Sequence, residues 1–199
     1  MALPQYVVSR TVINLEKGWL FSKGDPANAH DPMYNDKEWE TVTVPHDWAI
    51  YGPFDKSIDR QIVAIEQNNE RVATEKTGRT GSLPYIGTGW YRHHFDLPAT
   101  AAGQAVTLLF DGAMSRPVVY VNGQKVGEWG YGYNAFHLDI TPYVKTGATN
   151  VVAVRLENWE ESSRWYPGAG LYRPVQLILT NPVHIATWGN WITTPEVTT

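Results

Sequence analysis

The stretch that decides the fold class is Val121-Asn122-Gly123-Gln124-Lys125-Val126. An Asn-Gly pair accepts the positive backbone angles of a tight primed turn, and such two-residue turns join antiparallel strands. Val118–Val121 precedes the pair and is rich in the β-branched residues that favour extended backbone. We therefore predict a β-hairpin here.

Strand patterns continue outward from this hairpin in both directions. Each pattern is short, carries β-branched or aromatic residues and is bounded by turn residues. No segment shows a long helical period, which argues for an all-β chain. About eight to ten strands predict a β-sandwich of the jelly-roll type. The other predicted strands are Trp19–Phe21 (taken as the first), Trp39–Val44, Trp90–Leu97, Ala105–Phe110, Phe136–Ile140, Asn150–Leu156 and Tyr172–Thr180.

Two segments depart from this regular pattern. Residues 55–83 carry little strand signal, and we interpret them as a long excursion with a short helix near Asn69–Glu75. Val183–Ile192, after the break at Asn181-Pro182, reads as one more strand. A lone strand cannot pair with itself, so it is the first strand of a following domain, an edge strand or a linker. We therefore assign 1–181 to the sandwich and 182–199 to a linker or the start of a further domain.

Composition excludes several classes of partner. The chain has 199 residues and a formal net charge of −4, with no basic block, which argues against nucleic acid. No apolar run is long enough to span a bilayer, and no signal-peptide pattern is present. The absence of cysteine excludes disulfides and thiolate metal sites. Nine Trp and eleven Tyr are an excess that suits either stacking on sugars or filling a β core.

Two motifs carry the candidate binding chemistry. In Pro45-His46-Asp47-Trp48 a carboxylate lies between two aromatic rings, although Asp47 could equally cap the next turn. In the stretch 163–173, SRWYPGAGLYR, Arg164 offers a planar fork of donors beside aromatic faces. Such a group binds hydroxyls or a carboxylate, or it locks a loop.

The sequence shows no signature of a cofactor, a metal site or a catalytic pair. Phosphate-loop, zinc-helix and nucleophile-elbow patterns are missing. His93 and His94 are adjacent on a predicted strand, so they point to opposite faces and cannot share a metal ion. No two carboxylates are recognisable as the acid and nucleophile of a glycosidase. We expect no cofactor, no metal and no catalytic residue in this chain.

Several motifs together resemble the N-terminal domain of bacterial β-galactosidases of glycoside hydrolase family 2. Val44–Ile50 with Gly52-Pro53-Phe54 is similar to the entry motif of that family, and the stretch 163–173 is equally specific. Weaker matches lie between them, in order: Gly89-Trp90-Tyr91-Arg92, Val121-Asn122-Gly123 and Asp139-Ile140-Thr141. The resemblance covers about residues 12–180, and residues 55–83 differ from it in length and composition.

The resemblance implies a galactose-binding-like jelly roll at the start of a larger retaining glycosidase. An immunoglobulin-like domain and a TIM barrel would follow, and the barrel would carry both catalytic glutamates. The isolated chain is therefore expected to be inactive. Asp47 and Arg164 would contact galactose hydroxyls, and Trp165 would line the same sugar site. An Asp47–Arg164 ion pair that joins two loops is the alternative role.

Other functions stay open at this point. A stand-alone carbohydrate-binding module would use a platform such as Trp129, Tyr131 and Tyr133. A purely structural sandwich would bind no sugar. Within the family, β-glucuronidases and β-mannosidases are the alternatives to a β-galactosidase, since fold alone does not set the substrate. A homo-oligomer is one option for the assembly, and a periplasmic or secreted location is favoured over a cytoplasmic one.

Overall fold

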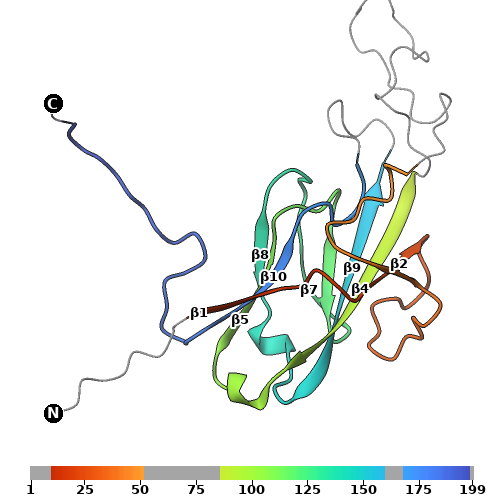
Figure 1. The fold of residues 1–199 in the computed structure, drawn as a ribbon, viewed down its shortest axis with the longest axis horizontal. Helices are drawn as coiled ribbons and strands as arrows, with labels where there is room; N and C mark the ends of the chain where they lie inside the picture. Colours follow the sequence, from red (N-terminus) through yellow and green to blue (C-terminus); the bar gives the residue numbers. More distant parts are fainter. Residues whose placement is uncertain (1–9, 52–85, 160–167, 198–199) are drawn as a thin grey trace, which may run out of the picture.

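The computed structural model describes residues 10–51, 86–159 and 168–197 (Figure 1). The excursion 55–83, its helix near Asn69–Glu75, and both Arg164 and Trp165 lie outside these residues. Within them the chain forms ten strands and two short 3-10 helices. In chain order these are β1 (Arg10–Asn14), β2 (Trp19–Lys23), β3 (Glu40–Val42), β4 (Gly87–Leu97), η1 (Ala99–Ala101), β5 (Ala105–Phe110), β6 (Val118–Val121), β7 (Gln124–Glu128), β8 (Phe136–Asp139), η2 (Thr141–Tyr143), β9 (Ala148–Asn158) and β10 (Val175–Thr180).

The strands form two antiparallel sheets that face each other (Figure 1). The smaller sheet has the strand order β1-β10-β5-β8, and the larger has the order β3-β2-β4-β9-β6-β7. Several neighbours in each sheet are far apart in sequence, since β10 lies between β1 and β5, and β9 between β4 and β6. The predicted all-β jelly-roll sandwich is confirmed. The two helices within the described ranges have three residues each, too few to cross a membrane.

The core lies between the sheets and is built by alternation along the strands. β4 and β9 pair over eleven positions, from Gly87 opposite Asn158 to Leu97 opposite Ala148. Every second side chain of these strands points inward, and burial of each such apolar side chain contributes about 1.5–3 kcal/mol. Fully or almost fully buried core residues include Tyr91, Phe95, Val152, Val154 and Leu156 from the larger sheet and Leu108, Phe110, Val175 and Leu177 from the smaller.

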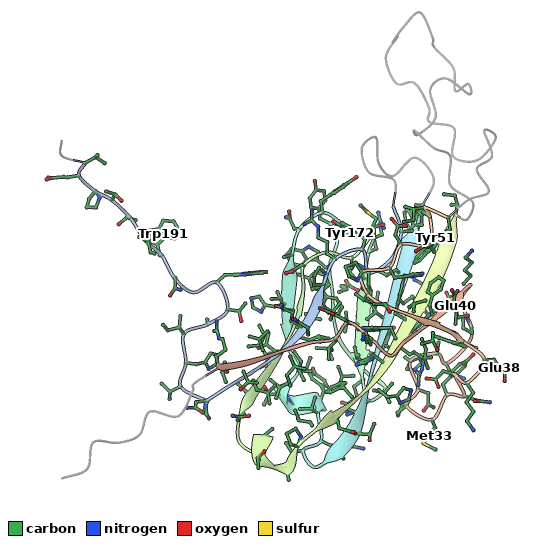
Figure 2. The ribbon with its side chains drawn as sticks, viewed as in Figure 1. Met33, Glu38, Glu40, Tyr51, Tyr172 and Trp191 are labelled. Atoms are coloured by element: carbon green, nitrogen blue, oxygen red, sulfur yellow. The ribbon has the colours of Figure 1, made fainter. Side chains whose placement is uncertain are left out.

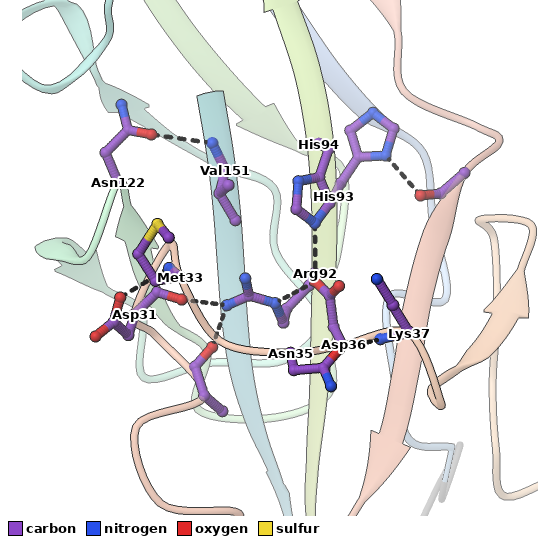
Figure 3. A network of polar contacts seen from close by, with 12 residues as sticks. Asp31, Met33, Asn35, Asp36, Lys37, Arg92, His93, His94, Asn122 and Val151 are labelled. Carbon is purple, nitrogen blue, oxygen red and sulfur yellow. Dashed lines mark hydrogen bonds and ion pairs between the residues drawn. The ribbon is translucent and has the colours of Figure 1, made fainter. Parts of the chain in front are cut away.

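The hairpin that the Asn-Gly pair predicts is confirmed. Asn122 and Gly123 have φ angles of 50° and 85°, which are the left-handed values of a primed turn between β6 and β7. The Asn122 amide also ties the turn to the sheet. It donates to the carbonyl of Tyr143 at 2.8 Å and accepts from the N–H of Val151 at 3.0 Å (Figure 3).

The loop between β2 and β3 covers the outer face of the larger sheet, and a buried arginine holds it there (Figure 3). The Arg92 side chain is fully buried and donates through Nε to the Asp36 carboxylate at 2.7 Å. Its Nη1 donates to the carbonyls of Ala29 and Asp31. His94 lies on the same face and bonds the same carboxylate at 2.8 Å. His93 points inward and stacks on Trp19, which confirms the predicted opposite orientation of the two histidines.

One sequence prediction about the start of the chain is wrong, and at its end the strand reading of Val183–Ile192 is not found, so the assignment of 182–199 to a linker or the start of a further domain stays a prediction. Trp19–Phe21 lies in the second strand rather than the first, because β1 precedes it. All five residues of β1 are exposed at the edge of the smaller sheet. The sequence of β1 therefore shows no alternation of apolar and polar residues by which the strand could be predicted. Val183–Ile192 forms no strand in the described residues. A strand needs a neighbouring edge to satisfy its backbone groups, and this segment leads away from the sandwich, with Trp191 90% exposed (Figures 1 and 2).

Candidate functional site

The two motifs singled out from the sequence meet at one end of the sandwich. The N–H of His46 donates to the Leu171 carbonyl at 2.8 Å, and the N–H of Trp48 donates to the Ala169 carbonyl at 2.9 Å. On its other side Gly170 exchanges two backbone hydrogen bonds of 2.9 Å with Met114. We call residues 45–49 and 168–171 the joined loops. Residues 45–49 follow β3 of the larger sheet, and residues 168–171 precede β10 of the smaller sheet. The two loops therefore meet where the two sheets face each other.

Asp47 is the side chain at the centre of the joined loops. Its Oδ1 accepts from the N–H of Ala49 at 2.8 Å, which makes the local turn that Asp often caps. The same oxygen accepts from the N–H of Ala169 at 2.9 Å. The carboxylate is buried, with 5% of the residue exposed. The alternative of a turn-capping role is therefore confirmed, and it extends across both loops.

Gly170 allows the joined loops to approach this closely. It has a φ of 130°, which L side chains rarely adopt. A Cβ at this position would collide with the His46 carbonyl oxygen and the Tyr91 hydroxyl. Gly170 therefore allows both the unusual backbone angle and the close contact between the two loops.

Aromatic side chains of the core pack against the joined loops. The Trp48 ring stacks on Phe21 at 5.3 Å with an interplanar angle of 21°. A Cβ at Gly89 would come within 2.8 Å of the Trp48 ring, so the glycine of the Gly89-Trp90-Tyr91-Arg92 motif makes room for this indole. Trp48 is 2% exposed, which places it in the core rather than on a sugar-facing surface.

His46 links the joined loops to β4. Its Nδ1 lies 2.7 Å from the Tyr91 hydroxyl, and its ring is tilted against Phe21 at 5.0 Å. Burial lowers the pKa of His46, while the nearby carboxylates of Glu40 and Asp47 act in the opposite direction. Burial therefore favours the neutral imidazole, which contacts Tyr91 through a hydrogen bond.

The other predicted site residues have different outcomes. Arg164 and Trp165 lie outside the described residues, so their proximity to Asp47 stays a prediction. Tyr131 and Tyr133 come together with ring centroids 5.5 Å apart, but the rings are tilted by 56° and do not form a flat platform. Trp129 stacks on Phe136 at 5.7 Å instead.

Sequence reasoning missed a charged cluster on the outer face of the larger sheet. Arg155 of β9 donates to both carboxylate oxygens of Asp25 and to Glu157, and the Trp90 indole N–H donates to Asp25 at 2.7 Å. The alternation along β9 could have indicated that Arg155 and Glu157 share a face, but the partner Asp25 is 130 positions away. No group of three or more metal-ligating His, Asp or Glu side chains occurs in the part of the chain that the structure describes.

Comparison with known proteins places this sandwich in a family. Residues 12–182 match the sequence pattern described as "Glycosyl hydrolases family 2, sugar binding domain", and the chain belongs to that family. The β-galactosidase BoGH2A of Bacteroides ovatus is 40% identical over 180 residues, which is 90% of this chain and 19% of that protein. A β-glucuronidase of Formosa agariphila is 32% identical over 190 residues, covering 88% of this chain and 18% of its own.

Solved structures agree with this assignment. A glycosyl hydrolase family 2 member from Bacteroides cellulosilyticus matches with a TM-score of 0.79 and 35% identity, over 96% of this chain and 23% of that one. The chain thus spans about a fifth of the length of the curated relatives named above. The family that the motifs of the two loops indicate is confirmed.

Proposed function

We propose that this chain is the N-terminal sugar-binding domain of a retaining glycoside hydrolase that removes terminal non-reducing β-D-galactosides in carbohydrate metabolism. The family match carries the proposal, and the relative at 40% identity is a β-galactosidase. The catalytic glutamates would belong to a TIM barrel of the parent protein, and an immunoglobulin-like domain would lie between. The isolated chain would then be inactive, because both catalytic glutamates would lie elsewhere in the parent protein.

In this proposal the joined loops position the sugar contacts. Ala169 is held by Asp47, and Arg164 lies five positions before Ala169 in the sequence. Arg164 would donate to sugar hydroxyls, Trp165 would line the site, and the Asp47 carboxylate would add to the same contact network. Positioning of this kind lowers the barrier to reaction by orienting the substrate before the chemical step.

A β-glucuronidase is the second candidate, because a relative of that activity is 32% identical to this chain. A β-mannosidase is the remaining alternative within the family. Galactoside ranks first because the relative at 40% identity is a β-galactosidase, whereas the β-glucuronidase is 32% identical.

The experiment measures kcat/KM of the full-length parent on p-nitrophenyl β-D-galactoside, β-D-glucuronide and β-D-mannoside. Asp47→Asn is the informative variant, because the amide oxygen can still accept from Ala49 and Ala169 while the charge is lost. If Asp47 and Arg164 contact the sugar, Asp47→Asn and Arg164→Ala should each lose about 2–4 kcal/mol of transition-state stabilisation at unchanged Tm.

Two results would overturn parts of this proposal. Activity within a few-fold of wild type in both variants would limit Asp47 and Arg164 to holding loops. Turnover of the glucuronide or the mannoside in place of the galactoside would keep the family and replace the substrate.

A further inference from the structure

A pocket of about 460 Å³ opens on the outer face of the larger sheet, away from the core. Its lining includes residues from the start of β6, the end of β7 and the last part of β9. Its volume is in the range of small-molecule sites. The side chains that line it belong to Arg116, Val118, Glu128, Trp129, Arg155 and Glu157, and Gly130 completes the lining. Neither the joined loops nor Asp47 belongs to this lining.

One wall of the pocket is an indole ring that is fixed in place. Trp129 stacks on the core residue Phe136 with an interplanar angle of only 10°, so one face of the ring is used for packing. The residue is nevertheless 40% exposed and borders the pocket. Aromatic faces held in this way stack on the apolar C–H face of a pyranose at little entropic cost.

The floor of the pocket offers donors and acceptors in a fixed arrangement. Arg155 Nη1 lies 2.6 Å from Glu157 Oε1, and both side chains remain about a fifth exposed, at 22% and 21%. Arg116 also lines the pocket, and its guanidinium lies 3.8 Å from the ring centroid of Trp159. Planar guanidinium and carboxylate groups bind neighbouring hydroxyls through paired hydrogen bonds.

The charges around the floor are balanced by pairing. Asp25 and Glu157 both contact Arg155, and Glu128 contacts Lys125 at 2.7 Å. An anionic ligand would find no surplus of positive charge among these groups and would meet three carboxylates. A neutral ligand rich in hydroxyls can hydrogen-bond to both the guanidinium and the carboxylate groups without electrostatic repulsion.

From these observations we propose that this pocket binds a neutral sugar, with Trp129 as the stacking surface and Arg155, Glu157 and Arg116 as the hydrogen-bonding groups. The proposal extends the proposed carbohydrate function of the chain to a surface that the family motifs do not include. It predicts a second point of attachment for a glycan, beside the one at the joined loops.

The test follows the indole and backbone N–H resonances of the 199-residue chain by NMR during titration with methyl β-D-galactopyranoside, methyl β-D-glucopyranoside and methyl β-D-glucuronide. We expect saturable shifts of the Trp129 indole with a neutral sugar, with a Kd on the order of 1 mM, and weaker binding of the glucuronide. In Trp129→Ala, the backbone N–H signals of Val118 and Glu157, which line the same pocket, should lose the saturable shifts that they show in wild type. Arg116→Ala, an exposed substitution that does not threaten folding, should weaken binding about tenfold.

A control variant separates this pocket from other exposed indoles. Trp191→Ala changes an indole that is 90% exposed on the C-terminal segment, so it should bind as wild type does. No saturable shift with any neutral sugar, unchanged binding in Trp129→Ala, or tighter binding of the glucuronide would each overturn the proposal. Failure of the proposed galactosidase function is read separately, from hydrolysis by the parent protein.

Discussion

The Asp47 carboxylate accepts a hydrogen bond from the backbone N–H of Ala169, which lies 122 positions later in the chain, at 2.9 Å. The same oxygen closes the local turn at Ala49. One buried atom therefore fixes both joined loops relative to each other.

Loss of the Asp47 side chain should destabilise the fold. Asp47→Ala leaves the N–H groups of Ala49 and Ala169 without this acceptor in a buried setting, which should lower the free energy of unfolding by about 2–4 kcal/mol. Urea denaturation of the 199-residue chain measures this. Asp139→Ala is the matched control, because Asp139 makes the same type of turn bond, to Thr141, on the exposed surface. Equal losses in the two variants would contradict a bridging role for Asp47.

Gly170 should tolerate no side chain. Gly170→Ala combines a left-handed φ with collisions against His46 and Tyr91, so we expect a loss of about 2–5 kcal/mol, seen as a lower Tm. Gly103→Ala separates the two effects, because Gly103 has a φ of 79° but open space around it. That control should lose only about 1–2 kcal/mol. A similar Tm for both variants would show that crowding at Gly170 is unimportant.

The buried Arg92 should depend strongly on its partner. Asp36→Ala leaves a fully buried guanidinium without its carboxylate, which should cost about 3–5 kcal/mol in urea denaturation. Within the described residues Arg92 Nη2 already has no acceptor, so the arginine is costly to bury. The double variant Arg92→Met with Asp36→Ala should therefore be more stable than Asp36→Ala alone. A double variant that is less stable would exclude this explanation.

Acidification should destabilise the chain through its partly buried histidines. Burial lowers the pKa of His46 and of His93, although the Gly18 carbonyl next to His93 acts in the opposite direction. Below an ordinary histidine pKa of about 6.5 the unfolded chain then binds more protons than the folded one, so stability falls as pH decreases from that value. Chemical denaturation between pH 7.5 and 5, as rough limits, should show this slope. His93→Gln should flatten it, while the exposed control His184→Gln should leave it unchanged.

The sequence predicted most of the strands because their signals are local. The Asn122-Gly123 turn and the β-branched run of β5 identify themselves within a few residues, and both strand and turn have the expected bounds. β1 gave no such signal, because an exposed edge strand has no buried face to impose alternation. Val183–Ile192 gave a misleading one, because β-branched residues favour extended backbone but cannot supply a pairing edge.

For the candidate site, the sequence by itself indicated Asp47 and the stretch 163–173 as candidate binding residues, because their residue types and motifs can be recognised without a structure. Only the tertiary structure decided what Asp47 contacts, since Ala169 reaches it through the order of strands in two sheets. The Trp129 pocket likewise exists only after β6, β7 and β9 become neighbours. The physical reason is that propensity and turn chemistry are local, whereas burial, pairing and pockets arise from contacts between segments that are distant in sequence.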